Sequence, residues 1–238
     1  MSVGLGEGPG KARFVSEMFS RIAGRYDLMN GLMTFGMHHA WRRVAARQTI
    51  AVPEGPALDL ATGTGDLALA LAAVHPGRLI VGADFSEGML HHGRAKVVAA
   101  SVRRLPLLAA DALTLPFADG AFACVVSAFL LRNLEDLGRG LGEMRRVTRP
   151  GGRVVTLDIV EPSAPMWSTL FGLYFNRVVP AIGALVAGDR QAYTYLPQSV
   201  ARFVRPAELA RRMTAVGLRD VSYRTMGLGT VALHVGTA

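Results

Sequence analysis

The segment 58–66, LDLATGTGD, constrains the fold of this chain more than any other. It joins an apolar run at 57–61, which is typical of a buried strand, to DLALALAAV at 66–74, which is typical of a helix that covers a sheet. Gly63 and Gly65 stand in the turn between them. A strand, a glycine turn and a helix allow the backbone to approach a ligand beside a helix N-terminus. Many such turns bind nothing, so the glycines alone do not establish a site.

Two further apolar runs are followed by a carboxylate. The run 78–84, RLIVGAD, ends in Asp84, which lies 19 positions beyond Gly65. That is close to the spacing of about 20 residues at which an acid reaches a ribose hydroxyl in dinucleotide folds. A third run, 105–110, is followed by Asp111. The carboxyl ends of parallel strands meet at one edge of a sheet, so these residues predict a nucleoside site there.

The acids around the glycine turn indicate which nucleoside binds. Asp66 follows Gly65 at the start of the helix, where a pyrophosphate would otherwise lie, so it disfavours a dinucleotide and tolerates a cation. S-adenosylmethionine is a nucleoside with a sulfonium and no phosphate, and it fits. Asp59 lies inside the apolar strand, where a carboxylate needs a partner. It is either part of the cofactor site or an acceptor for the amides of the turn.

The sequence resembles the class I SAM-dependent methyltransferases and, among them, the ubiquinone/menaquinone biosynthesis C-methyltransferases. The resemblance covers about 14–236, and its most specific segments are YDLMN at 26–30 and GDRQAYTYLP at 188–197. It implies an α/β fold with a Rossmann-like, mostly parallel sheet, an antiparallel hairpin at its C-terminal edge and helices on both faces. Leu130 stands before LRN where the family usually has Gly, and Thr148 replaces an apolar residue.

The domain organisation that we predict is one methyltransferase domain, 51–238, preceded by a flexible end, 1–13, and cap helices within 14–50. The two cap helices are expected at 14–27 and 37–50, either simply packed on the sheet or closing the cofactor pocket with Tyr26 near the methyl donor. Further elements are expected as follows: a strand at 122–129, a helix at 137–147, a tight turn at 149–152, a strand at 153–159, a helix at 206–216, and a hairpin of 219–223 with 230–235.

The insertion at 161–203 is rich in aromatic and aliphatic residues. Its longest apolar part, 166–188, is interrupted by Asn176, Arg177 and Pro180, so we expect no stretch of the chain to span a bilayer. We interpret the insertion as a helical lid that binds a lipophilic substrate and touches the membrane. The alternative is an ordinary helical cap buried on the sheet.

The resemblance also implies roles for individual residues. Thr64, Gly63 and Gly65 should line the methionine end of the cofactor, Asp84 should bind the ribose, and Phe85 should lie beside the adenine. The full cofactor set is Asp59, Gly63, Thr64, Gly65, Asp84, Phe85, Asp111 and Ala112, with Asp111 and Ala112 at the adenine amino edge. The substrate set is Phe129, Tyr174, Tyr193 and Tyr195.

The expected reaction is transfer of a methyl group to the ring carbon of a polyprenylated quinol. Such an in-line displacement needs mainly alignment and electrostatic stabilisation. Loss of a hydroxyl proton makes the neighbouring ring carbon nucleophilic, so the substrate must be reduced. Our hypothesis is that Arg132 stabilises the phenolate, Asn133 orients it, and Tyr26 or a water relays the proton. The alternative for Arg132 is an ion pair with Glu135 or Asp136. Demethylmenaquinol is favoured, but the resemblance does not separate naphthoquinol from benzoquinol.

Three other functions are weighed against this one. They are methylation of another lipophile such as a sterol or phenol, a catalytically silent SAM-binding scaffold for quinone synthesis, and a nucleic-acid methyltransferase. The chain has a net charge of +8, but its 26 basic residues are scattered, and motifs for amino or cytosine-C5 methylation of bases are missing. We therefore expect no nucleic-acid partner, and a basic surface that meets anionic lipid headgroups instead.

Cysteine and histidine usage bounds the remaining chemistry. Cys124 is the only cysteine and lies in an apolar run, which indicates a buried strand residue and excludes an internal disulfide. The six histidines show no metal-ligand spacing, so no metal is expected. These features favour a cytoplasmic protein that meets the inner face of the membrane peripherally. The sequence allows a homodimer but does not determine the oligomeric state.

Overall fold

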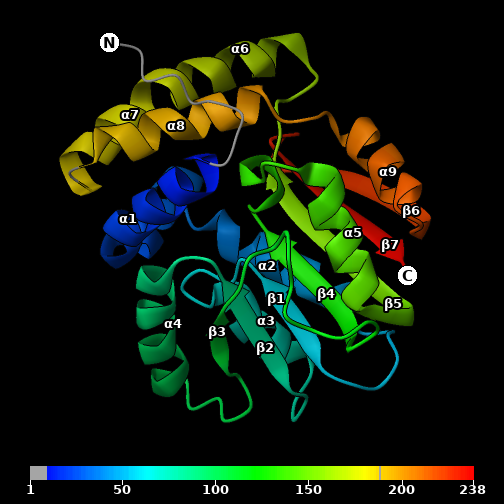
Figure 1. Ribbon diagram of the computed structural model, residues 1–238. Helices are drawn as coiled ribbons and strands as arrows, with labels where there is room; N and C mark the ends of the chain where they lie inside the picture. Colours follow the sequence, from blue (N-terminus) through cyan, green and yellow to red (C-terminus); the bar gives the residue numbers. More distant parts are fainter. Residues whose placement is uncertain (1–9, 188) are drawn as a thin grey trace.

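A mostly parallel sheet forms the centre of the protein in the computed structural model, which describes residues 10–187 and 189–238 (Figure 1). Its order within these residues is β3-β2-β1-β4-β5-β7-β6. The strands are β1 (Ala57–Leu60), β2 (Ile80–Asp84), β3 (Leu107–Ala109), β4 (Phe122–Ala128), β5 (Thr148–Ile159), β6 (Arg219–Met226) and β7 (Val231–Thr237). β1 pairs in parallel with both β2 and β4, so the glycine turn leaves the middle of the sheet. The predicted fold class is confirmed.

The C-terminal edge is the expected antiparallel hairpin. β7 pairs with β5 and β6 in antiparallel register, and Gly227 and Gly229 have positive φ in the turn. The turn predicted at 149–152 is wrong as a separate element, because β5 already begins at Thr148. This part of the sheet is irregular instead. The pairing of β4 with β5 shifts register between Phe122 and Cys124, and Gly151 in β5 has a φ of 75°.

Helices cover both faces of the sheet. α2 (Met37–Arg47), α3 (Asp66–Val74) and α4 (Glu87–Ala99) pack on one face, and α5 (Leu137–Val147) and α9 (Pro206–Ala215) pack on the other. In Figure 1 α5 lies in front of the sheet, and α2 and α3 lie behind it. The bounds of α3 and α5 agree with the prediction because continuous apolar periodicity marks both ends. Cys124 is fully buried in β4, as expected.

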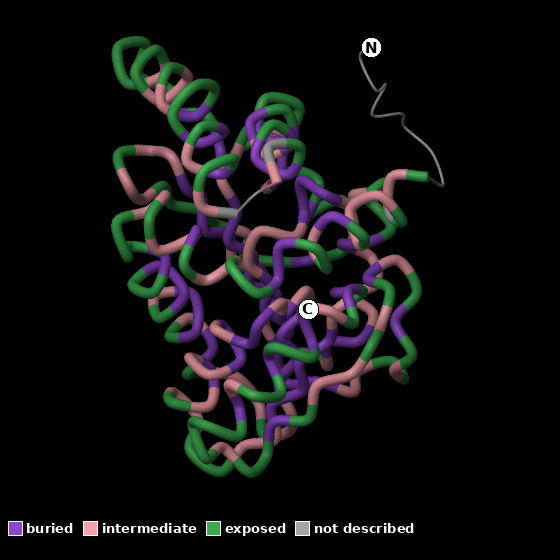
Figure 2. Tube along the Cα trace, turned by 90° about the vertical axis from the view of Figure 1, so that its left-hand side faces the viewer, coloured by how far each residue is buried: buried purple, intermediate pink, exposed green. Residues whose placement is uncertain are grey.

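A third apolar core lies outside the sheet, among the cap and the lid. It joins α1 (Gly10–Thr34) to the insertion and to α8 (Arg190–Ala201), and Met18, Met29 and Val179 are among its buried members. Figure 2 shows buried residues in this cap and lid core as well as in the sheet. The prediction that the first helix ends at Tyr26 and Asp27 is wrong, since α1 continues to Thr34. The helix also begins at Gly10, inside the end that was expected to be flexible, whereas residues 1–9 lie outside the described residues.

The insertion is a continuous helix followed by α8. It consists of α6 (Pro165–Leu173), η2 (Tyr174–Val178), α7 (Val179–Ile182) and η3 (Gly183–Ala187), where η2 and η3 are π-helical. The π turns on both sides of Pro180 accommodate the hydrogen bond that proline cannot donate. The expectation that the segment is too interrupted to span a bilayer is corrected. Pro165–Val186 meets the length and composition of a membrane-spanning helix, at 22 residues and mean hydropathy 1.4. Core helices of soluble proteins can meet the same criteria.

Candidate active site

The glycine turn is fixed by the carboxylate of Asp84. Ala61 and Gly63 both have positive φ, of 59° and 55°, and this sharp path turns the Gly63 N–H toward the end of β2. Gly63 N–H donates to Asp84 Oδ2 at 2.8 Å, and Ser86 N–H donates to Asp84 Oδ1 at 2.8 Å. Burial raises the pKa of Asp84 despite these two donors. Each oxygen keeps a free lone pair, so the carboxylate can accept further hydroxyl donors.

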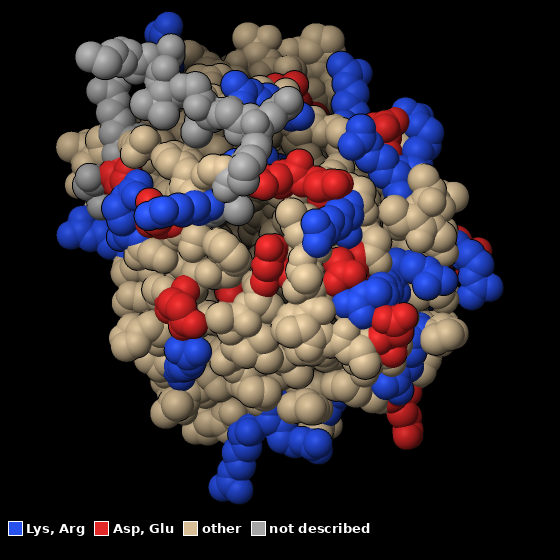
Figure 3. Space-filling view, viewed as in Figure 1, with Lys and Arg blue, Asp and Glu red and all other residues tan. Residues whose placement is uncertain are grey.

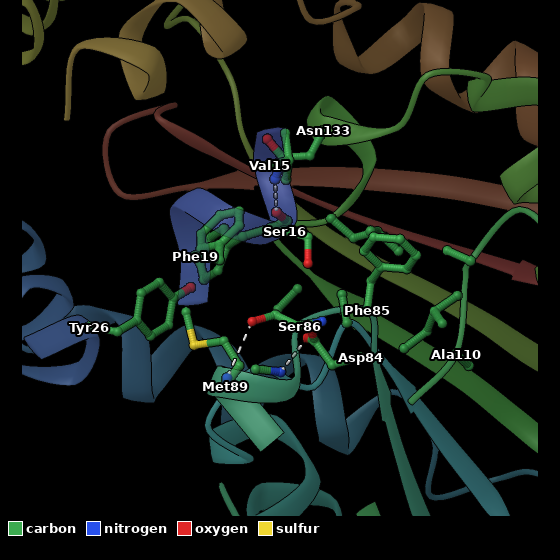
Figure 4. A pocket seen from close by; sticks show the side chains of 17 residues that line it. Val15, Ser16, Phe19, Tyr26, Asp84, Phe85, Ser86, Met89, Ala110 and Asn133 are labelled. Carbon is green, nitrogen blue, oxygen red and sulfur yellow. Dashed lines mark hydrogen bonds between the residues drawn. The ribbon is translucent and has the colours of Figure 1, made fainter. Parts of the chain in front are cut away.

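A cavity opens at this turn, and we call it the cofactor cavity. Figure 4 shows Phe19 and Tyr26 of α1 on one side of it and Asp84, Ser86 and Met89 on the other. The predicted site residues among its lining are Gly63, Asp84, Phe85, Ala112, Tyr26, Phe129 and Asn133. Leu130, which stands where the family usually has Gly, also lines this cavity.

Four predicted cofactor residues, Asp59, Thr64, Gly65 and Asp111, are not among the residues that line this cavity. Asp59 is fully buried and accepts a hydrogen bond from Thr62 Oγ1 at 2.6 Å, which supports the turn from below. Burial raises the pKa of Asp59 to about 7. Asp111 is exposed and accepts from its own loop, at the Leu113 N–H. Its neighbours in sequence, Ala110 and Ala112, are the residues that line the cavity.

An ionic network that the sequence analysis missed ties the cap to the glycine turn. Lys96 Nζ of α4 lies 2.5 Å from Asp27 Oδ2 of α1 and 2.6 Å from Asp66 Oδ1 of α3. Thr64 Oγ1 donates to Asp27 Oδ1 at 2.6 Å, and Lys96 Nζ donates to Thr64 Oγ1 at 3.1 Å. Thr64 and Gly65 therefore act in holding the turn, with Gly65 capping α3 at φ 87°. Lys96 is one of only two lysines in the chain, which was the available signal.

A second cavity adjoins the first, and we call it the acceptor cavity. Phe19, Tyr26 and Phe129 line both cavities, so these rings form the boundary between them. Tyr193 and Tyr195 line the acceptor cavity from α8 and are nearly buried, as the substrate assignment requires. Burial raises the pKa of both phenols, which therefore stay protonated near neutral pH. The fold brings residues 19, 129 and 193 together from three distant segments.

Arg132 forms a buried ion pair at the acceptor cavity. Its Nη1 lies 2.6 Å from Asp158 Oδ1, and the two side chains are only 6% and 2% exposed. The partner suggested by the alternative, Glu135 or Asp136, is thus replaced by Asp158 at the end of β5. Local sequence could not reveal this pair, because residues 132 and 158 are brought together by the pairing of β4 with β5.

The backbone at Phe129 positions both predicted catalytic side chains. Phe129 has φ 65°, a strained value for a residue with a Cβ, and its carbonyl accepts from Arg132 Nη1 at 2.8 Å and Asn133 Nδ2 at 3.0 Å. Tyr195 Oη donates to Asn133 Oδ1 at 3.2 Å. Both side chains lie in or beside η1 (Leu131–Asn133), directly after β4. Asn133 reaches the cofactor cavity and Arg132 the acceptor cavity.

An outer groove continues from the acceptor cavity to the surface. The two share Met33, Thr34, Trp41, Ile159 and Phe175, and the groove is further lined by Phe35, Trp167, Leu170 and Leu228. Tyr174 lies in this groove, with its hydroxyl donating to the Met33 carbonyl at 3.0 Å. It is therefore placed along the groove and not beside Tyr193 and Tyr195.

The fold assembles one group of potential metal ligands that sequence spacing did not indicate. His38, His39 and Asp66 bring ligand atoms within 4.8 Å of one another. Asp66 Oδ1 is already 2.6 Å from Lys96 and Asp66 Oδ2 is 3.5 Å from Arg42. These cations compete with any metal for the carboxylate, so the group is better described as part of the ionic network.

Charges are intermixed on the face of the protein seen in Figure 3, where basic and acidic side chains alternate without a continuous basic band. Several of the arginines are paired locally. Arg146 binds Glu143 and Asp119, and Arg211 and Arg212 both bind Glu208. Such pairing uses part of the excess positive charge in local contacts.

The chain is similar to proteins of a known family. A profile of the ubiE/COQ5 methyltransferase family matches residues 8–238. The chain belongs to the ubiE/COQ5 methyltransferase family. The family expected from the sequence is confirmed, and this member is a SAM-dependent methyltransferase.

Relatives match almost the whole chain of this ubiE/COQ5 family member. A demethylmenaquinone methyltransferase of Thermus thermophilus is 46% identical over 219 residues, which are 92% of this chain and 99% of the relative. One of Roseiflexus sp. (strain RS-1) is 44% identical over 228 residues, 95% of this chain and 94% of the relative. A ubiquinone/menaquinone biosynthesis C-methyltransferase UbiE of Geotalea daltonii is 40% identical over 228 residues, 95% and 97% of the two chains.

Solved structures of lower identity share the fold of this ubiE/COQ5 member. A SAM-dependent methyltransferase of Thermotoga maritima, described as a possible histamine N-methyltransferase, has a TM-score of 0.63 at 19% identity and covers 93% of this chain and 98% of its own. The cofactor cavity fits S-adenosylmethionine chemically. Asp84 offers buried acceptor oxygens suited to ribose hydroxyls, and Phe85, half exposed, offers an aromatic face suited to an adenine.

Proposed function

We propose that this enzyme methylates a ring carbon of a polyprenylated quinol, with demethylmenaquinol as its first substrate. The observation that carries the proposal is the pair of adjoining cavities, one beside the glycine turn and one apolar, which meet at Phe19, Tyr26 and Phe129. A methyl donor in the first and a flat apolar ring in the second would face each other across this boundary. The names of the relatives from Thermus and Roseiflexus support the naphthoquinol.

The residues around the boundary supply alignment and charge. S-adenosylmethionine supplies an electrophilic methyl group on a sulfonium. The ring carbon of the quinol forms the new C–C bond as the methyl–sulfur bond breaks and S-adenosylhomocysteine is released, and the carbon then loses its hydrogen as a proton. Arg132, held in place by Asp158, stabilises negative charge on the neighbouring quinol oxygen, and Asn133 is oriented for the same oxygen by Phe129 and Tyr195. Tyr26, on both cavities, is placed to relay a proton.

The outer groove is suited to the prenyl tail of this substrate. Its lining is almost wholly apolar, and it leads from the acceptor cavity to a rim where Phe35 is 82% and Leu228 is 69% exposed. Exposed large apolar side chains in such a rim mark a surface for lipid or protein. A tail that lies in the groove would continue into a bilayer touching the rim.

The lid helix supports peripheral binding at the cytoplasmic face of the membrane. Phe175 and Val179 are buried against α1 and α8, so that face of the helix is occupied by protein. Met166, Leu170 and Leu173 lie at helical spacing on another face and are each about half exposed or more, at 69%, 49% and 54%. A helix packed on one side and apolar on another lies in the interface rather than across it.

The test is transfer of labelled methyl from S-adenosylmethionine to demethylmenaquinol, kept reduced and dispersed in detergent. Label is expected in menaquinol, and the oxidised quinone serves as the control that should remain unlabelled. The demethyl benzoquinol is assayed in parallel, because the relative from Geotalea carries both quinones in its name. Tight binding of S-adenosylmethionine without transfer to either quinol would contradict the proposal and favour a silent scaffold.

A further inference from the structure

Four buried polar atoms of side chains that line the acceptor cavity lack a hydrogen-bond partner among the described residues. They are Asn30 Nδ2, His38 Nε2, Arg132 Nε and Tyr193 Oη. A buried polar atom without a partner costs free energy, so a native protein rarely leaves several together. An apolar cavity with a few such atoms is typical of a site whose ligand supplies the missing partners.

The hydrogen bonds of Thr34 decide which tautomer His38 adopts. Thr34 Oγ1 donates its single proton to the Asn30 carbonyl at 2.6 Å. The same oxygen lies 2.7 Å from His38 Nδ1 and accepts from the His38 backbone N–H at 3.4 Å. Since Thr34 has no second proton to give, His38 Nδ1 must carry the hydrogen and donate it. In the neutral imidazole, Nε2 is then left with a bare lone pair.

The surroundings of His38 keep this ring neutral. The side chain is 1% exposed, and burial, together with Arg42 and His39 nearby, lowers its pKa to about 4, against the opposing effect of Asp66 and Asp27. Near neutral pH, Nε2 therefore accepts a hydrogen bond and cannot donate one. The ring is anchored on the side of Nδ1, so it cannot exchange the two roles without breaking the bond to Thr34.

We propose that His38 makes the acceptor cavity selective for the reduced substrate, because His38 Nε2 accepts a hydrogen bond from a quinol hydroxyl. A quinone carbonyl carries no proton, so its lone pairs would face the lone pair of Nε2 and repel it. The selectivity rests on the proposed function, since it requires the quinol ring in this cavity. A site that hydrogen-bonds a substrate hydroxyl rejects the analogue without it strongly, as its own polar atom is then left unpaired.

Asn30 completes the pairing at the same hydroxyl. It lies on α1, one helical turn before Thr34, and its side-chain amide also lines the cavity. A hydroxyl both donates and accepts, so an Asn30 N–H and the His38 lone pair are the two partners that it requires. A carbonyl could use only the Asn30 donor. Selectivity between the two redox forms is therefore assigned to His38 and not to Asn30.

The experiment compares the binding of the two redox forms of a short-chain demethylmenaquinone. Dissociation constants are measured anaerobically by quenching of tryptophan fluorescence, since Trp41 lines the cavity and Trp167 the outer groove. The proteins are wild type, His38→Ala, His38→Gln and the control His91→Ala, an exposed histidine on α4 that is not among the residues lining either cavity or the outer groove. Binding of S-adenosylmethionine confirms the fold of each, and the better filled His38→Gln carries the test if His38→Ala does not fold.

Wild type and His91→Ala are expected to bind the quinol at least about tenfold more tightly than the quinone. For His38→Ala the ratio should approach one. His38→Gln should also lose the preference, because its amide can turn either a donor or an acceptor to the ligand. The inference is wrong if the folded His38 variants keep the wild-type ratio, or if wild type itself shows no preference while it methylates the quinol. If wild type neither binds nor methylates either form, the proposed function fails as well.

Discussion

The two cavities of this enzyme are built by different physical means. The cofactor cavity lies at the ends of adjacent parallel strands, and short hydrogen bonds from backbone amides to Asp84 fix its shape. The acceptor cavity lies between a cap helix, a lid and α8, and is held mainly by apolar packing around Met18, Phe175 and Tyr193. The wall that the sheet gives to the first cavity comes from turns that follow adjacent strands, whereas the second is closed by helices from three remote segments. A cavity of the first kind can remain constant while the second changes its substrate.

Substitution of Arg132 should separate the roles of the two cavities most clearly. Arg132→Ala should reduce kcat by about 100- to 1000-fold, because it removes the charge opposite the forming phenolate. Binding of S-adenosylmethionine should change little, since Arg132 lines the acceptor cavity. Single-turnover methyl transfer and calorimetric titration measure the two effects. Arg139→Ala, at an exposed arginine bound to Thr114, is the control. Near-normal turnover of a folded Arg132→Ala protein would remove Arg132 from the mechanism.

Substitution of Asp84 tests the cofactor cavity, as substitution of Arg132 tests the acceptor cavity. Asp84→Ala frees two backbone amides and removes the proposed ribose acceptor, so the Kd for S-adenosylmethionine should rise by about 10- to 100-fold. Asp111→Ala is the matched control, because it also follows a strand but is exposed and bonds within its loop. We expect a smaller effect there, measured by the same titration. Equal losses for both variants would contradict the assignment of the ribose site to Asp84.

Leu173 tests whether the lid side of the acceptor cavity meets lipid. Leu173→Gln should weaken binding to vesicles that contain anionic lipid by roughly tenfold. The reason is that about half of the apolar surface of a leucine side chain would no longer be buried in the lipid. Turnover of substrate in detergent should not change, since Leu173 lies outside the lining of both cavities and the groove as described. Vesicle sedimentation measures the binding. Val98→Gln, at another exposed apolar residue on α4, is the control, and an equal loss there would exclude a specific lid surface.

Asp59 gives the smallest effect, on stability. Burial raises its pKa to about 7, so the folded state holds the proton more tightly than the unfolded state does. The contribution of protonated Asp59 to the free energy of unfolding is fully present below the pKa of the unfolded state, about 3.9. It is lost as the pH rises through the folded-state pKa of about 7. Asp59→Asn keeps an acceptor for Thr62 but cannot ionise. The stability of the variant relative to wild type should therefore increase from pH 5 to pH 8 in urea unfolding. A constant difference would show that Asp59 does not titrate in this range.

The sequence determined the order of elements that builds the cofactor half. The order strand, glycine turn, helix places Gly63 and Asp84 at adjacent strand ends whatever the rest of the chain does, because parallel pairing brings those ends together. Continuous apolar periodicity similarly defined α3 and α5. The roles of Asp59 and Asp111 were less certain, since the direction of a side chain at a strand end depends on its loop. The assignment of individual site residues to ligands stays a prediction.

Only the tertiary structure decided the acceptor half. Sequence indicated aromatic residues at 174, 193 and 195, but their placement depended on how the lid packs on α1, and Tyr174 went to the outer groove. The partner of Arg132, Asp158, and the tie of Lys96 to Asp27 join residues that are distant in the chain. Apolar packing carries no directional code, so many arrangements of a cap and lid suit the same pattern. The burial of His38 beside the acceptor cavity also follows from that packing.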